Sequence, residues 1–159
     1  MKHKKALTLL AILLSFCLLL GLDVWTKAWA VLQLNEPMSL MGDWFYLIPF
    51  VKNEGIAFSI MLPQWFQIGS GVLILGGLMG YGTQQVLKMD RFKLLSAIFL
   101  GVVLGGGVGN LIERIGKGYV VDFIVLGPIP IFNIADVGVV LGLLGLFATM
   151  QVTSTPKTK

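Results

Sequence analysis

The chain has 159 residues, of which 56% are hydrophobic and only 13% are charged, and its mean hydropathy is +0.86. This length is typical of one domain, but a soluble fold of this size cannot bury so much apolar surface, so the composition excludes an ordinary water-soluble protein. The net charge of +4 does not indicate a nucleic-acid partner, because the basic residues gather at the ends of apolar segments instead of forming a stripe.

An apolar run near the N-terminus predicts the first transmembrane helix. Residues 1–5 contain three lysines, and residues 6–22 contain no charge. A cleaved signal peptide is the alternative, but the run is longer than a usual h-region, and no small-x-small cleavage site follows it. The bulky Phe16 also does not fit a lipobox before Cys17, the single cysteine, which permits no intramolecular disulfide. We expect an uncleaved helix over about residues 6–27, long enough to cross a ~30 Å hydrocarbon core.

Three further apolar segments bring the expected number of spans to four. They lie at about residues 65–87, 94–112 and 134–151. Eight of the twelve Lys and Arg residues lie at the two termini or in the turn 88–93, whereas seven of the eight acids lie in the opposite loops or at their edges. By the positive-inside rule, we expect both termini in the cytoplasm.

The predicted fold class is a membrane all-α protein with a small β element, in a single integral-membrane domain over residues 1–159. Its extracytoplasmic loops are expected at residues 28–64 and 113–133. In the first loop, residues 44–48 and 57–60 are typical of short strands between turn residues. We expect this β element to lie on the membrane surface, with its aromatic side chains at headgroup level.

The third span carries a repeat of small residues. Gly101, Gly105 and Gly109 recur every four residues, so they share one face of the helix. Such a face lets another helix approach closely, and the sequence leaves open whether that helix belongs to the same chain or to a second copy.

Asp122 and Asp136 are candidate reactive groups at one membrane edge, where carboxylates are expensive to desolvate. The segment between them contains Gly127, Pro128 and Pro130, which favour a chain reversal that brings the two acids together. Two carboxylates a few ångströms apart do not both ionise easily, so one holds a proton near neutral pH while the other can take a proton from water. This is the chemistry of an aspartyl protease.

A purely structural interpretation is the alternative for each acid. Asn133 can cap the fourth helix with Asp136 in its first turn, where a carboxylate favours the helix dipole, and Asp122 can be a solvated loop acid. The only histidine, His3, lies at the basic N-terminus, which excludes a histidine-assisted triad. The two aspartates and the asparagine are too few ligands for a metal site, so we expect no metal and no cofactor.

Two other classes of membrane protein compete with a protease. A small transporter or channel would need polar residues along a path through the spans, and the polar residues of the second and third spans lie mostly near their ends. A non-catalytic scaffold explains the spans but not the acids clustered on one side. We therefore favour the protease.

Five short motifs follow one another along the chain: Asp23-x-x-Thr26-Lys27, Asn53-x-Gly55-x-Ala57-Phe58, Gly109-Asn110-x-x-Glu113-Arg114, Val120-Val121-Asp122-Phe123 and Phe132-Asn133-x-Ala135-Asp136. Each motif alone is a weak signal. Together, with the length and the loop pattern, they resemble the lipoprotein signal peptidases, the bacterial signal peptidase II family. The resemblance covers nearly the whole chain, from the first span to the fourth.

The resemblance implies removal of signal peptides from prolipoproteins, by cleavage just before a cysteine that already carries diacylglycerol. It implies that Asp122 and Asp136 are the catalytic pair. The supporting, substrate-binding residues that it implies are Asp23, Lys27, Asn53, Gly55, Asn110, Arg114 and Asn133. It also implies an extracytoplasmic β cradle and a multi-pass protein of the bacterial cytoplasmic (inner) membrane with its active site at the periplasmic face. The implied partners are prolipoproteins, membrane lipids and the cyclic peptide inhibitor globomycin, which occupies the catalytic pair.

Two residues depart from the family pattern. Glu113 stands where aspartate is usual, and its extra methylene moves the carboxylate by about 1 Å, so we expect a retuned support rather than an inactive enzyme. Ile56 stands where alanine is commoner, and we expect it to narrow or reshape the substrate groove.

For several supporting residues the sequence leaves two roles open. Lys27 either pairs with Asp23, four residues earlier on the helix, or contacts substrate. Asn53 and Gly55 are either turn residues or substrate-binding residues. Arg114 is expected to hold acids and loop carbonyls in place, because its guanidinium does not release a proton.

Overall fold

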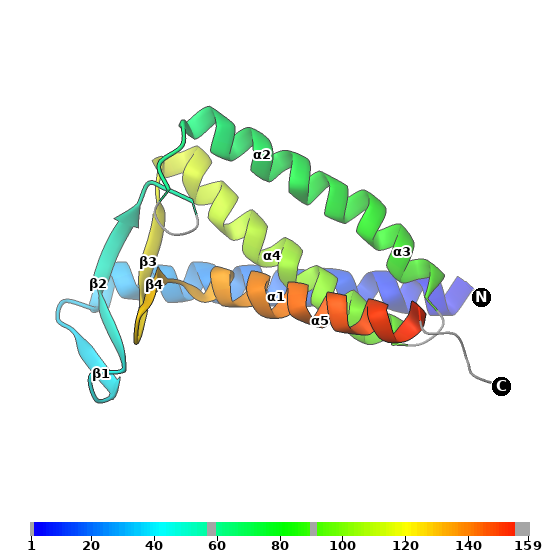
Figure 1. The fold of residues 1–159 in the computed structure, drawn as a ribbon, viewed down its shortest axis with the longest axis horizontal. Coiled ribbons are helices and arrows are strands. Elements are labelled where there is room, and N and C mark those ends of the chain that lie inside the picture. Colours follow the sequence, from blue (N-terminus) through cyan, green and yellow to red (C-terminus); the bar gives the residue numbers. More distant parts are fainter. Residues whose placement is uncertain (1, 57–59, 90–91, 155–159) are drawn as a thin grey trace.

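The computed structural model describes residues 2–56, 60–89 and 92–154, and it consists of a helical bundle with a small sheet at one end (Figure 1). The elements in chain order are α1 (Lys2–Gln33), β1 (Met38–Met41), β2 (Phe45–Asn53), α2 (Gln64–Gly77), the π-helical segment η2 (Leu78–Gly82), α3 (Thr83–Lys88), α4 (Lys93–Lys117), β3 (Val120–Leu126), β4 (Ile129–Phe132) and α5 (Ile134–Ser154).

Three helices of the described residues are long and apolar enough to cross a membrane. These segments are His3–Gln33, Lys93–Lys117 and Ile134–Gln151, in α1, α4 and α5. They correspond to three of the four expected spans, although α1 and α4 extend beyond the expected ends at residues 27 and 112. The expected span 65–87 is helical but is divided into α2, η2 and α3, so the count of four spans stays a prediction.

Helix α4 lies at the centre of the bundle, in contact with α1, α2 and α5. Its glycine face packs against α1: a Cβ added at Gly105 would lie 2.6 Å from the carbonyl oxygen of Phe16. A Cβ added at Gly106, on another face, would lie 2.5 Å from the carbonyl oxygen of Ala135 in α5. The repeat of small residues therefore serves helix packing within this chain.

The helices alternate in direction, so α1 begins and α5 ends at the same end of the bundle (Figure 1). Helix α3 ends and α4 begins near that end too, and the sheet lies at the opposite end. This arrangement brings the C-terminal ends of α1 and α4 close to the N-terminal end of α5, beside the strands.

The sheet is antiparallel, with four strands in the order β1-β2-β3-β4, and it combines segments from both predicted loops. The expected strand at residues 44–48 is present in β2, which starts at Phe45 and continues to Asn53. Of the expected strand at 57–60, residues 57–59 lie outside the described residues, and Ile60 is not in a strand. The sequence analysis did not anticipate β1, β3 or β4.

Two turn-forming residues shape the sheet. Pro49 lacks a backbone N–H and lies in the irregularity of the β2–β3 pairing between Leu47 and Val51, so it does not end the strand. Gly127 has a φ of +50° and reverses the chain between β3 and β4, which confirms the expected fold-back. Its N–H donates to the carbonyl of Trp44 (2.8 Å), which ties this hairpin to the start of β2.

The glycine face predicts a sharp difference between two glycine substitutions. We expect Gly105→Ala to lower the free energy of unfolding by about 1–3 kcal/mol, because the added methyl group forces α1 and α4 apart. Gly76→Ala in α2 is the control, since a Cβ there has no neighbour within 4 Å. The measurement is thermal unfolding in detergent, and equal loss in both variants would contradict close α1–α4 packing.

Candidate functional site

The two candidate aspartates lie at the sheet end of the bundle, on different elements. Asp122 is on β3, pairs in register with Val51 of β2, and is 2% exposed. Asp136 is in the first turn of α5 and is half-buried. The interpretation of Asp122 as a solvated loop acid is therefore wrong, because the strand is covered by the bundle and the side chain is buried.

A single buried residue, Asn133, contacts both aspartates through its side chain and its backbone. Asn133 Nδ2 donates to Asp122 Oδ1 (2.6 Å), and the Asn133 backbone N–H donates to Asp136 Oδ2 (3.2 Å). In return, the Asp136 backbone N–H donates to Asn133 Oδ1 (3.0 Å), which confirms the expected helix cap. Since the oxygen of this amide must accept from that N–H, its NH2 group is directed to Asp122.

A second amide, Asn110 of α4, orients Asp136 from the other side. Asn110 Nδ2 donates to Asp136 Oδ1 (2.8 Å), and Asn110 Oδ1 accepts from Lys27 Nζ (2.8 Å) and from Asn133 Nδ2 (3.3 Å). An ammonium group can only donate, so it fixes which end of the Asn110 amide points toward Lys27. Each carboxylate oxygen of Asp136 thus accepts an N–H.

Lys27 is 4% exposed, and its ammonium group has three close partners. It lies 2.8 Å from Asp23 Oδ2 and 3.0 Å from Glu113 Oε2, in addition to the Asn110 oxygen. The pairing with Asp23, one of the two alternatives from the sequence, is present. Two carboxylate oxygens and one amide oxygen surround the ammonium group, so this lysine is held as an internal cation.

The two acids beside Lys27 connect it to the elements that carry the aspartates. Asp23 Oδ1 accepts from the backbone N–H of Ala135 (3.0 Å), at the start of α5. Glu113 Oε2 accepts from the backbone N–H of Val121 (3.1 Å), next to Asp122 on β3. Glu113 also pairs with Lys117 (2.8 Å). The longer side chain of Glu113 therefore makes contacts that support the site.

Asn53, at the end of β2, holds the second oxygen of Asp122. Its Nδ2 donates to Asp122 Oδ2 (2.7 Å), while its Oδ1 accepts from the Gly55 N–H (3.0 Å) in a turn. The Gly55 carbonyl accepts from Arg114 Nη2 (3.0 Å), and Arg114 Nε donates to Gln67 Oε1 (3.0 Å). The expectation that Arg114 holds a loop carbonyl is confirmed.

The structure thus brings all nine residues from the sequence analysis into one connected cluster. The sequence analysis treats Glu113 as a departure from a pattern and does not single out Gln67. The only signal for Gln67 is a polar side chain near the start of an uncharged segment. Across the described ranges 2–56, 60–89 and 92–154, no three His, Cys, Asp or Glu side chains are grouped as metal ligands.

Burial raises the pKa of Asp122 to about 6, and the negative charge of Asp136 contributes to this rise. The hydrogen bonds from Asn53 and Asn133 and the positive charge of Lys27 act in the opposite direction. A carboxyl group with such a pKa exchanges its proton near neutral pH, as a general acid or base must.

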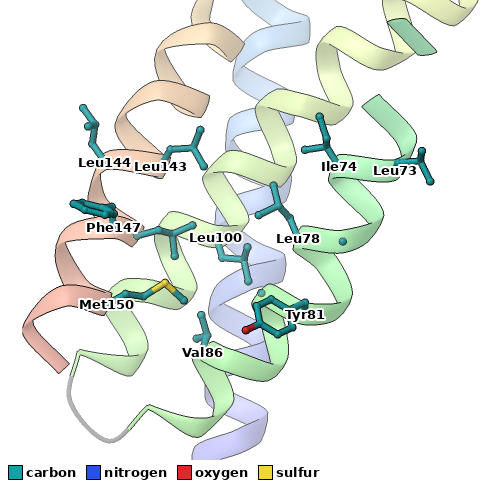
Figure 2. A pocket seen from close by; sticks show the side chains of 13 residues that line it. Leu73, Ile74, Leu78, Tyr81, Val86, Leu100, Leu143, Leu144, Phe147 and Met150 are labelled. Carbon is teal, nitrogen blue, oxygen red and sulfur yellow. The ribbon is translucent and has the colours of Figure 1, made fainter. Parts of the chain in front are cut away.

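A large apolar cavity, whose lining residues are shown in Figure 2, includes no residue of this cluster. It has a volume of about 770 Å³ and lies between α2–α3 and α5, against α4. Its lining includes Leu78, Val86, Leu100 and Phe147, and the Tyr81 hydroxyl is its only side-chain oxygen. No lining group can activate water, so the candidate chemistry belongs to the aspartate cluster.

Comparison with known proteins identifies a related family. The sequence profile of the Signal peptidase (SPase) II family matches residues 15–152. The lipoprotein signal peptidase of Syntrophomonas wolfei is 37% identical over 131 residues, which cover 80% of this chain and 84% of that protein. That of Moorella thermoacetica is 38% identical over 112 residues, covering 70% and 72%.

Solved structures show the same fold. A structure described as a bacterial membrane enzyme, at 2.3 Å resolution, matches with a TM-score of 0.79 and 25% identity, covering 93% of this chain and 92% of that chain. A second one, at 1.9 Å resolution, matches with a TM-score of 0.74 and 24% identity, covering 91% and 94%.

The raised pKa of Asp122 predicts a pH-dependent stability. Between about pH 4 and pH 6 the folded state binds more protons than the unfolded state, so the free energy of unfolding falls as the pH rises through this window. We expect Asp122→Asn to flatten this part of the curve of thermal midpoint against pH. Asp43→Asn, which changes an exposed acid, is the control and should keep the slope. An unchanged slope in Asp122→Asn would contradict the assignment.

The two lysines that pair with Glu113, Lys27 and Lys117, should differ strongly in their contribution to the free energy of unfolding. Lys27→Met leaves Asp23 and Glu113 without their buried counter-ion, so we expect a loss of about 3–5 kcal/mol in the free energy of unfolding. The Lys117 side chain is 49% exposed, so Lys117→Met should cost about 1 kcal/mol or less. Chemical unfolding in micelles measures both, and similar losses would show that Lys27 is not the central cation.

Proposed function

The chain belongs to the signal peptidase II family, and on this premise we propose that it is an intramembrane aspartyl endopeptidase of prolipoproteins. Its substrates are diacylglyceryl-modified prolipoproteins, and it cleaves just before the lipidated cysteine and releases the signal peptide. The observation that carries the proposal is that one residue, Asn133, donates to both carboxylates, through its side chain to Asp122 and through its backbone N–H to Asp136. Such a link supports two carboxyl groups that act on one bound peptide.

The two aspartates have different surroundings, which suggests different roles. Asp122 is buried and has a raised pKa, so we assign it the proton that polarises the scissile carbonyl oxygen. Asp136 is half-buried and accepts N–H groups at both carboxylate oxygens, so we assign it the ionised form that takes a proton from the attacking water. The proton gained in this step can pass to the leaving amine when the peptide bond breaks.

The supporting residues fall into two groups in this proposal. Lys27, Asp23, Asn110 and Asn133 fix the direction of the N–H groups that reach the aspartates. Asn53 and Gly55 lie on a loop end beside Asp122, where a substrate backbone can bind, and Arg114 holds this loop end through the Gly55 carbonyl. Globomycin is then expected to compete with substrate at the same pair.

We further propose that the helical segment 64–88 is a fourth span, so that both termini lie in the cytoplasm. The cluster of polar residues then lies at the outer face of the cytoplasmic membrane, with the sheet as a cradle beside it. Three exposed tryptophans at the sheet end, Trp25, Trp44 and Trp65, support this placement, because tryptophan favours the membrane interface. A substrate anchored by its acyl chains and signal helix would reach the site by lateral diffusion.

The decisive experiment is cleavage of a diacylglyceryl-modified lipobox peptide by the purified protein in detergent. We expect Asp122→Asn and Asp136→Asn each to lower kcat by about a thousandfold or more while the protein stays folded, because each removes one of the two proton-transfer groups. Asp43→Asn, in an exposed turn, is the matched control and should cleave normally. Near-normal cleavage by either site variant would reject the aspartyl mechanism, and no cleavage by folded wild-type protein would reject the proposed function.

A further inference from the structure

Gln67 is a buried polar residue whose contacts lie outside the proposed catalytic pair. It lies in the first turn of α2 and is 7% exposed. Its Nε2 donates to two backbone carbonyls, those of Glu54 (2.9 Å) and Leu62 (2.7 Å), and its Oε1 accepts from Arg114 Nε (3.0 Å). Every hydrogen-bonding atom of this amide therefore has a partner.

The orientation of the Gln67 amide follows from the chemistry of its neighbours. The Nε–H of an arginine can only donate, and a carbonyl can only accept, so the oxygen faces Arg114 and the NH2 group faces the two carbonyls. Glu54 directly follows β2 and Leu62 lies two residues before α2, so both lie near the ends of the connection between these elements. A backbone hydrogen bond from Ile56 N–H to Ile60 carbonyl (3.0 Å) joins these ends as well.

A continuous set of contacts runs from Gln67 to Asp122. Gln67 holds Arg114, whose Nη2 donates to the Gly55 carbonyl, and the Gly55 N–H donates to Asn53 Oδ1. Because the Asn53 oxygen is occupied in this way, its Nδ2 points to Asp122 Oδ2. These hydrogen bonds therefore connect residues 53–55 to Gln67 through Arg114.

We propose that Gln67 is a positioning residue of the reaction: it joins the backbone at Glu54 and Leu62 to Arg114 and so holds the Asn53 amide against Asp122. The inference rests on the proposed function for its kinetic consequence. The clamp, meaning the hydrogen bonds of Gln67 to Glu54, Leu62 and Arg114, is a property of the fold. Burying an uncharged amide with all its partners costs little free energy, but removing it leaves two carbonyls and an arginine N–H without their partner.

The test compares two glutamines of the same helix. Gln67→Met keeps the length of the side chain and removes its hydrogen bonds, while Gln64→Met makes the same chemical change three residues earlier. Gln64 is exposed and donates to the Arg114 carbonyl (2.8 Å) without contacting the loop. The measurements are cleavage of the lipobox peptide against pH and hydrogen exchange at the amides of Gly55 and Ile56.

We expect Gln67→Met to lower kcat/KM by about ten- to a hundredfold, because misplacement by about 1 Å at a catalytic pair has effects of this size. The limb of the pH profile that reports Asp122 should also move to higher pH, since the Asn53 hydrogen bond lowers its pKa. The charges of Asp136, Lys27 and Arg114, which also face Asp122, are unchanged in this variant. Gln64→Met should match the wild type in both respects.

A double variant separates positioning from general destabilisation. If Gln67 acts through Asn53, the losses in Asn53→Ala and Gln67→Met do not add, and the double variant resembles Asn53→Ala alone. Additive losses, or an unshifted pH profile with only a lower thermal midpoint, would overturn the proposal. If the wild-type protein does not cleave, the proposed function fails, and hydrogen exchange alone decides the clamp: faster exchange at Gly55 and Ile56 in Gln67→Met supports it, and unchanged exchange overturns it.

Discussion

The site depends on one constraint: two carboxyl groups from separate elements must be held by a single residue, Asn133. Asn133 directly follows β4 and caps α5. Its side chain therefore contacts Asp122 on the neighbouring strand β3, while its backbone contacts Asp136. Because Asp122 is buried, the arrangement is stable only if each oxygen has a donor, which Asn133 and Asn53 supply. The geometry of the site therefore depends on the register of the sheet, which places Asp122, and on the start of α5, which places Asp136.

The buried cation Lys27 links the helices to this arrangement. It lies between α1 and α4, and its two acid partners reach the backbone of α5 through Ala135 and of β3 through Val121. Close approach of α1 makes this possible: a Cβ added at Gly109 would lie 2.7 Å from Asp23 Oδ2. The glycine face and the charge cluster thus depend on each other, since the glycines leave the space that the ion pairs fill.

Local sequence patterns predicted the helices well and the strands poorly. Long apolar runs have few alternatives in a membrane, so α1, α4 and α5 were expected near their observed positions. The strands β3 and β4 depend on pairing across a sheet that includes β2, a partner more than 60 residues away, and no local pattern encodes that pairing. The role of Gln67 was missed for the same reason, since its partners come from a loop and from α4.

The sequence by itself determined the membrane class, the resemblance to signal peptidase II and the choice of two candidate aspartates, because hydrophobic runs and short motifs are properties of consecutive residues. Only the tertiary structure decided which atoms meet. It showed that Lys27 is enclosed by three acceptors, that Asp122 is buried, and that Asn133 contacts both acids. The physical reason is that burial and hydrogen-bond direction depend on segments that are distant in sequence. Burial by these segments raises the pKa of Asp122.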